Sequence, residues 1–225
     1  MLNIPLLLTL VELFLFKEVA GHMAMMEPAP RRSEYNPFFR QSNDIDYDIT
    51  SPLDSQRPYP CQGAPRSHTV ATYQAGRSIS VRIGGDASHA GGHCQFALSY
   101  DGGRTFVVIQ TVLDTCLSKG NQFSVPLPKD APSGNQVIFA WTWINKTGDR
   151  QYYMNCADIV VNGKKTGGKV TGPRLLVANY GNLPVIPEWP DPEWQGRKQF
   201  QARPIITILG PRGNVEEEED DDDED

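Results

Sequence analysis

Histidine has the clearest capacity for chemistry in this sequence, because its ring nitrogens bind metals and titrate near neutral pH. The chain contains four histidines, and the first, His22, directly follows a largely apolar segment, residues 1–21. If a signal peptidase cuts after Gly21, His22 becomes the N-terminal residue. Its α-amine and ring Nδ1 can then chelate a metal ion, since a terminal amine loses its proton far more readily than a lysine does. A second imidazole would complete three nitrogens in a T, an arrangement that favours copper.

The segment 4–16, IPLLLTLVELFLF, is typical of the apolar part of a secretory signal peptide. It is too short to span a bilayer, and small residues follow it. Glu12 interrupts the run and no basic residue precedes it, so a buried N-terminal helix is the alternative. We expect a signal peptide at 1–21, a secreted extracellular protein, and no association with a membrane.

Three other histidines could supply the second imidazole. His89 lies in the loop SHAGGHC, which leads into the strongest hairpin signal of the chain, so a rigid sheet would hold its side chain. His93 lies four residues further on and is a second candidate. His68 lies in the irregular stretch APRSHTVATY, where a solvated loop histidine is the simpler interpretation.

Short runs of β-branched and aromatic residues, separated by turn residues, predict an antiparallel β fold. Asp101-Gly102-Gly103 separates QFALSY from TFVVIQTV and predicts a hairpin. SISVRI, residues 78–83, alternates polar and apolar side chains with a period of two. We therefore expect an all-β, immunoglobulin-like or fibronectin-III-like antiparallel sandwich with long loops. Further strands are expected at 136–144, 156–161 and 204–209.

Composition divides the rest of the chain. We expect the sandwich domain at 22–165, a Pro/Gly-rich C-terminal extension at 166–215 that packs partly on it, and a disordered acidic tail at 216–225. The tail dominates the formal net charge of −6, and the remainder of the mature chain is mildly basic. Its Lys and Arg are scattered, which argues against a nucleic-acid partner.

The cysteines and one sequon are consistent with secretion. Four cysteines in a secreted protein predict two disulfides, for which the sequence allows three pairings. No CxxC pair is present, which argues against a structural zinc site. Asn145-Lys146-Thr147 is the single N-x-S/T sequon without a blocking proline, so Asn145 is a candidate glycosylation site. The cysteines are Cys61, Cys94, Cys116 and Cys156.

Three blocks together resemble the fungal lytic polysaccharide monooxygenases of auxiliary activity family 11, or a close sister family. They are HMAM…SPL…YPCQG, ASHAGGHCQFALSYDGGRTF and FAWTWINKTGDRQYYMNCADIVV, and they cover roughly residues 22–161. The resemblance implies a monomeric oxidoreductase with one copper ion held by a histidine brace on an immunoglobulin-like sandwich. Such an enzyme uses O2 or H2O2 and an external electron donor to cleave β-1,4 bonds in an insoluble, crystalline polysaccharide, here chitin before cellulose.

The resemblance also assigns roles to particular residues. The brace is His22, through its amine and Nδ1, and His89, through Nε2. Tyr153 lies axial to the copper, and its neighbour Tyr152 points to the opposite face of the strand. Ala87, two residues before His89, is the small residue that shapes the open face of the copper.

Two positions depart from the family pattern. The family commonly has glutamate where this chain has Gln151; glutamine can hydrogen-bond to the reacting oxygen but cannot deliver a proton. The family usually has a small residue at the position of His93. A histidine there could be a proton relay, a weak second metal site or, as we expect, a solvent-exposed bystander.

The family pattern pairs Cys94 with Cys116, around the hairpin, and Cys61 with Cys156, between the long N-terminal excursion and the last core strand. We hypothesise that Cys61–Cys156 also holds the segment bearing His22 near Tyr153; a C61A/C156A variant with full copper affinity would contradict this.

Two alternatives to the enzyme remain open. One is a secreted histidine-brace copper-binding protein without monooxygenase activity, which Gln151 fits equally well. The other is a non-catalytic carbohydrate-binding module, in which Trp189 and Trp194 would stack on sugar rings. Packing of these tryptophans onto the domain is the simpler interpretation.

Overall fold

The computed structural model describes residues 23–190, 193–210 and, for the backbone, 215–217. The expected signal peptide, His22 and the acidic tail beyond residue 217 lie outside these residues. Glu216 and Glu217 lie in a short strand, so the prediction of disorder was wrong for the first two residues of the tail. Pairing uses backbone groups alone, which is why an acidic sequence can add to a sheet edge.

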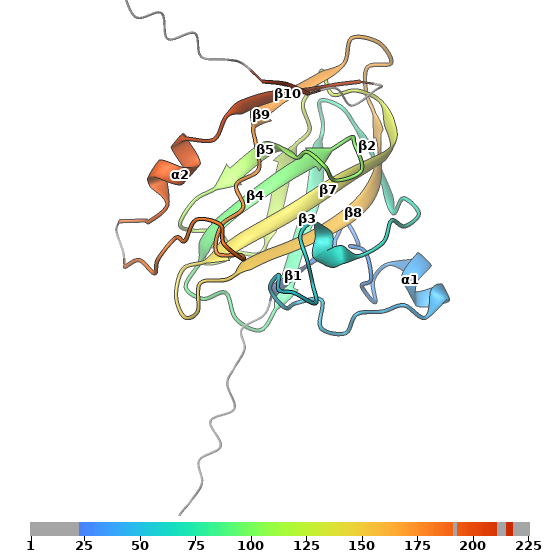
Figure 1. Cartoon of the computed structure of the whole chain (residues 1–225). Helices are drawn as coiled ribbons and strands as arrows, with labels where there is room; N and C mark the ends of the chain where they lie inside the picture. Colours follow the sequence, from blue (N-terminus) through green and yellow to red (C-terminus); the bar gives the residue numbers. More distant parts are fainter. Residues whose placement is uncertain (1–22, 191–192, 211–214, 218–225) are drawn as a thin grey trace, which may run out of the picture.

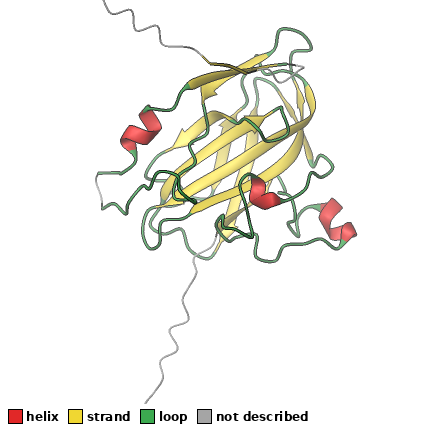
Figure 2. Ribbon diagram, viewed as in Figure 1, coloured by secondary structure: helices red, strands yellow, loops and turns green. Residues whose placement is uncertain are grey.

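The chain folds as an all-β sandwich, which confirms the predicted fold class (Figures 1 and 2). A five-stranded sheet has the order β2-β8-β7-β4-β5, and a three-stranded sheet has the order β1-β3-β6. A third sheet, β11-β10-β9, comes from the C-terminal part of the chain. All pairings are antiparallel except β2 with β8. The strands are β1 (Met23–Glu27), β2 (Ala71–Gln74), β3 (Ser78–Gly85), β4 (Gly92–Ser99), β5 (Val107–Val112), β6 (Gln122–Pro126), β7 (Gly134–Asn145), β8 (Tyr152–Asn162), β9 (Lys169–Pro173), β10 (Ile205–Leu209) and β11 (Val215–Glu217).

The strands predicted from alternation and β propensity are confirmed, including the hairpin of β4 and β5 around Asp101-Gly102-Gly103. In β3, Ile79, Val81 and Ile83 point inward and the residues between them are more exposed, as the period of two predicts. The helical elements are short: α1 (Pro37–Ser42), α2 (Arg197–Gln201) and the 3₁₀ turn η1 (Cys61–Gly63). None of the described helices is long and apolar enough to cross a membrane.

The five-stranded sheet is buried on both faces. One apolar cluster lies between the two main sheets, and a second lies on the outer face, under the excursion from residue 28 to residue 70 and the C-terminal segment. Tyr153 belongs to the first cluster and Tyr152 to the second, so adjacent residues of β8 do point to opposite faces. Double burial explains why β7 and β8 are nearly continuous apolar runs rather than alternating ones.

The C-terminal extension is closely integrated with the domain. β9 and β10 pair with each other, and their residues Val170, Ile206 and Ile208 complete the core cluster between the sheets. Between them the chain carries Trp189 and α2 along the β4–β5 side of the large sheet (Figure 1). The extension therefore covers surface that the sandwich would otherwise expose.

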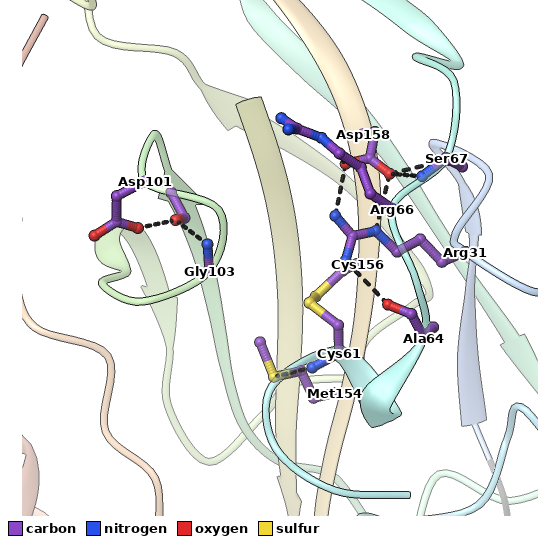
Figure 3. Close-up of a disulfide and its surroundings, with 11 residues drawn as sticks. Arg31, Cys61, Ala64, Arg66, Ser67, Asp101, Gly103, Met154, Cys156 and Asp158 are labelled. Carbon is purple, nitrogen blue, oxygen red and sulfur yellow. Dashed lines mark hydrogen bonds and ion pairs between the residues drawn. A yellow bond between two sulfur atoms is a disulfide. The ribbon is translucent and has the colours of Figure 1, made fainter. Parts of the chain in front are cut away.

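Arg31 fastens the N-terminal excursion to β8 through Asp158 (Figure 3). Arg31 donates two hydrogen bonds to the Asp158 carboxylate, at 2.7 and 2.8 Å, and its backbone N–H donates to the Cys156 carbonyl at 2.8 Å. Asp158 also accepts from the backbone N–H of Ser67 at 2.9 Å. Asp158 is only 1% exposed, so these bonds satisfy a buried carboxylate.

The structure contains the disulfides Cys61–Cys156 and Cys94–Cys116, the two pairs that the resemblance implies. Cys61–Cys156 lies beside the Arg31–Asp158 ion pair and adds a covalent tie to it (Figure 3). In the chain-entropy view, closing a loop of this length stabilises the fold by about 2–5 kcal/mol.

Candidate metal centre

The first described strand, β1, begins beside the end of β3, from which the chain leads to His89. Met23 in β1 pairs with Gly85 at the end of β3. The chain leaving β3 then passes through Ala87 to His89, and both side chains are half-buried. His22 itself lies outside the described residues, but it is covalently joined to Met23. The strand register therefore places Met23, the residue after His22, opposite Gly85, which lies four residues before His89 in the sequence.

Close packing holds His89. Its backbone has a positive φ of 48°, and its carbonyl accepts a hydrogen bond from the Thr147 N–H at 3.2 Å. Its ring centroid lies 5.9 Å from that of Trp143. On another side is Gly148, where an added Cβ would come within 3.2 Å of the His89 Nδ1. Gly148 has a φ of +83°, so both its backbone and the space beside it suit glycine.

Tyr153 lies against the same tryptophan. Its ring centroid is 4.8 Å from that of Trp143, and its hydroxyl donates a hydrogen bond to the Gln151 Oε1 at 3.0 Å. Burial raises the pKa of Tyr153 to about 12, and the negative charge of Asp149 adds to the effect. At neutral pH the phenol is therefore protonated, and the amide nitrogen of Gln151 remains available as a donor.

Three of the predicted site residues thus meet at one end of the sandwich. The rings of His89 and Tyr153 both contact Trp143. The sequence did not single out Trp143 as a site residue. Pairing β7 with β8, which sets Trp143 opposite Tyr153, could have identified it. His68 lies elsewhere, exposed and stacked on Phe38 at 4.7 Å, as expected for a loop histidine. Within the described ranges, no three His, Cys, Asp or Glu side chains gather closely enough to hold a metal ion.

His93 is not the exposed bystander that we expected. It is 1% exposed and stacks on Trp189, with ring centroids 4.3 Å apart. Its Nε2 lies 2.8 Å from the Gln195 carbonyl, and its Nδ1 accepts a hydrogen bond from the Asp114 N–H at 2.9 Å. The extension buries this histidine, and both ring nitrogens are already hydrogen-bonded, one to Gln195 of the extension and one to Asp114, so it is neither a proton relay nor a second metal site.

The surroundings of His93 also decide the role of the tryptophans. Trp189 is 1% exposed and donates from Nε1 to Asp114 Oδ1 at 2.7 Å, while Trp194 is half-buried against His93. Packing of the extension is confirmed for Trp189, and the prediction that this residue stacks on sugars was wrong.

Lys146 donates to the same Asp114 oxygen, Oδ1, at 2.9 Å. Asp114, missed in the sequence, therefore joins the extension to the chain that follows β7.

This network supports the loop of His89. The Asp114 carbonyl accepts from the Gly92 N–H at 2.9 Å, and the Lys146 N–H donates to the Gly91 carbonyl at 3.0 Å. These bonds fix Gly91, which precedes β4, and Gly92, the first residue of β4. Cys116 also donates from its N–H to the Gly92 carbonyl at 3.2 Å, next to its disulfide with Cys94.

Asn145 does not suit the glycosylation predicted from its sequon. Its side chain is fully buried, and its amide nitrogen donates to the carbonyls of Thr147 and Asp149, at 2.8 and 2.7 Å. Its Oδ1 accepts from the Gln151 N–H at 2.9 Å. A glycan needs this nitrogen exposed, so the structure corrects the prediction: Asn145 shapes the turn before Gln151.

We expect His93 to make folding stability depend on pH. Burial lowers the pKa of His93 from 6.5 to about 4, so below pH 6.5 the unfolded chain binds a proton that the folded chain does not. The contribution of His93 to the free energy of unfolding is fully present above pH 6.5. It falls by roughly 3 kcal/mol as the pH is lowered to the pKa of the folded state. Denaturant unfolding at a series of pH values measures this. His93→Phe, which keeps the ring stacking but cannot titrate, should flatten the profile; parallel profiles for the two proteins would contradict the prediction.

No protein-family model matches the sequence. Among curated proteins, AA11 family lytic polysaccharide monooxygenase A of Aspergillus fumigatus is 42% identical over 170 residues, which are 72% of this chain and 76% of that protein. An AA11 family lytic polysaccharide monooxygenase of Aspergillus oryzae is 30% identical over 66% of this chain. AA11 family lytic polysaccharide monooxygenase B of A. fumigatus is 27% identical over 75% of this chain. The matches span only 37% and 43% of these last two proteins.

Solved structures with a related shape are more distant. The crystal structure of HiLPMO9B gives a TM-score of 0.41 at 16% identity, over 52% of this chain and 64% of that chain. A chitin binding domain from Burkholderia pseudomallei gives a TM-score of 0.40 at 9% identity, over 63% of this chain and 99% of that domain.

Proposed function

The chain belongs to the AA11 family of lytic polysaccharide monooxygenases, oxidoreductases that act on polysaccharides, and from this premise we propose that it is a secreted copper enzyme. Its substrate is an insoluble, crystalline β-1,4-linked glycan, with chitin the first choice and cellulose the second. O2 or H2O2 is the oxidant, and an external donor supplies electrons. The protein acts as a monomer after removal of residues 1–21.

The observation that carries the proposal is the meeting of His89 and Tyr153 beside the start of β1. His89 lies on the loop that continues β3, and its ring and that of Tyr153 both contact Trp143. With Met23 paired to Gly85, a free amine at His22 belongs to the same end of the sandwich. This supports a brace formed by the amine and Nδ1 of His22 and by Nε2 of His89.

The donor chemistry of this end of the sandwich fits copper. Imidazole and amine nitrogens suit copper better than they suit calcium or magnesium, and the protonated Tyr153 phenol would be a weak oxygen donor to it. When bound, copper supplies the one-electron chemistry with O2 or H2O2 that oxidises a sugar carbon next to the glycosidic bond. Ala87 precedes His89 on the same loop, and its small side chain leaves room for the substrate.

Gln151 would direct its side-chain amide nitrogen, a hydrogen-bond donor, towards the oxidant. Its Oε1 accepts from the Tyr153 hydroxyl at 3.0 Å, and its backbone N–H donates to Asn145 Oδ1 at 2.9 Å. Both contacts fix the amide, so its nitrogen can donate to an oxygen of the oxidant. An amide does not release a proton at neutral pH, so the two protons consumed when O2 and two electrons hydroxylate the sugar would come from water, and oxidation by H2O2 would need none.

Of the two alternatives, a copper-binding protein without oxidation remains compatible with Gln151. A carbohydrate-binding module depends on exposed tryptophans in the extension, and Trp189 is buried. Product formation decides between the enzyme and the copper-binding protein.

The test uses mature, copper-loaded protein whose N-terminal residue has been shown to be His22 by sequencing. We expect oxidised oligosaccharides after incubation with chitin, ascorbate and oxygen, detected by mass spectrometry. A matched control retains Gly21, which blocks the amine with a peptide bond; it should bind copper weakly and release no product. Tight copper binding without product would favour the copper-binding protein, and equal activity of the extended form would refute the brace.

A further inference from the structure

A cavity of about 250 Å³ lies between β1 and β3 of the three-stranded sheet and the N-terminal excursion. One wall is formed by the start of β1 and the end of β3, from Ala24 to Met26 and from Gly84 to Asp86. The other wall is the N-terminal excursion, at residues 33–35 and 45–50, which runs beside β1 (Figure 1). Asp86 in the cavity wall immediately precedes Ala87 on the chain that leads to His89, so the cavity lies on the approach to the proposed reaction site.

The charged residues that line the cavity are all carboxylates: Glu34, Asp46 and Asp86. Asp46 is partly neutralised by Arg57, whose Nε lies 3.5 Å from the Asp46 carboxylate and which lines a neighbouring cavity. Glu34 and Asp86 are exposed, and neither forms an ion pair with another described residue. The cavity therefore carries negative charge that a bound cation would neutralise.

Two tyrosines provide an aromatic surface in the same cavity. Tyr35 is 45% exposed and Tyr47 is 85% exposed, and both line the cavity. Among the described residues, no other tyrosine, phenylalanine or tryptophan is as exposed. A sugar ring has apolar faces that pack on aromatic rings, so exposed tyrosines in a cavity are suited to a saccharide.

A buried hydroxyl in the wall lacks a partner. Ser33 is 1% exposed, lines the cavity, and its Oγ has no hydrogen-bond partner among the described residues. Buried hydroxyls are usually paired, because leaving one unpaired is unfavourable. The Oγ is covered in the free protein, so pairing it with a hydroxyl or amino group of a bound sugar requires the wall to open slightly.

We propose that this cavity is a subsite for a positively charged glucosamine unit, so that partly deacetylated chitin is the preferred polymer. This inference rests on the proposed function for its link to oxidation. The cavity is smaller than the roughly 300–1,000 Å³ of most sites for drug-sized ligands, and it suits a single sugar ring. A protonated amine gains attraction from Glu34 and Asp86, whereas the neutral acetamide of N-acetylglucosamine does not.

Binding is measured by calorimetry with copper-loaded mature protein and no reductant, so that no turnover occurs. The ligands are glucosamine and N-acetylglucosamine oligomers of equal length. We expect the glucosamine oligomer to bind about fivefold more tightly at acidic pH and low salt, and to lose this advantage at alkaline pH or high salt. Glu34→Gln should remove most of it, Tyr47→Ala should weaken both ligands, and Glu193→Gln, an exposed acid outside the cavity, should change neither.

Equal affinities for the two oligomers, or a preference that survives Glu34→Gln combined with Asp86→Asn, would overturn the subsite. These outcomes are separable from failure of the proposed function. A protein that prefers glucosamine but yields no oxidised product keeps the subsite and loses the enzyme. A protein that oxidises chitin without this preference keeps the enzyme and loses the subsite.

Discussion

We expect replacement of His89 with alanine to remove tight copper binding and to abolish polysaccharide oxidation. The variant loses one of the three nitrogens proposed to hold the metal. It also loses the imidazole ring that packs against Trp143. We expect copper affinity to fall by more than about 100-fold, because losing a residue that only supports a ligand already costs roughly 10–100-fold. Calorimetric copper titration of the mature protein measures the affinity, and mass spectrometry of products from chitin measures the activity.

His68→Ala is the matched control, since His68 is exposed and stacks on Phe38 away from the candidate centre. It should bind copper with unchanged affinity and one-to-one stoichiometry. Circular dichroism of His89→Ala would show whether the fold is intact. A folded His89→Ala protein that still takes up one copper ion tightly would refute the assignment of the brace.

Replacing Asp158 with alanine should destabilise the fold by about 3–5 kcal/mol. Arg31 and Asp158 are 8% and 1% exposed, and their two hydrogen bonds fasten the N-terminal excursion to β8. Removing the carboxylate leaves a buried guanidinium without a counter-charge, which costs far more than the loss of a surface pair. Urea unfolding at neutral pH measures the change in the free energy of unfolding.

The neighbouring ion pair provides the control. Arg32 also donates two hydrogen bonds, to Asp44, but these side chains are 38% and 41% exposed. Asp44→Ala should cost less than about 1 kcal/mol, because water solvates the arginine that remains. Similar losses for Asp44→Ala and Asp158→Ala would show that burial does not determine how much the Arg31–Asp158 pair stabilises the fold.

Sequence determined the parts of this protein that depend on local pattern. Alternation in SISVRI places Ile79, Val81 and Ile83 in the core because a strand with one buried face must repeat every two residues. The same rule separates Tyr152 from Tyr153. The loop of His89 was identifiable because a glycine-containing stretch before a strong hairpin must lie at the end of a sheet.

Only the tertiary structure decided which side chains water can reach. His93 resembles a surface histidine in its own loop, yet the chain around Trp189, almost a hundred residues away, covers it. Asn145 matches a sequon, but three residues that follow it in the same turn occupy its amide. Asp114 and Trp143 gain their roles from partners brought together by strand pairing. Burial is a property of the whole packed chain, so no local pattern specifies it.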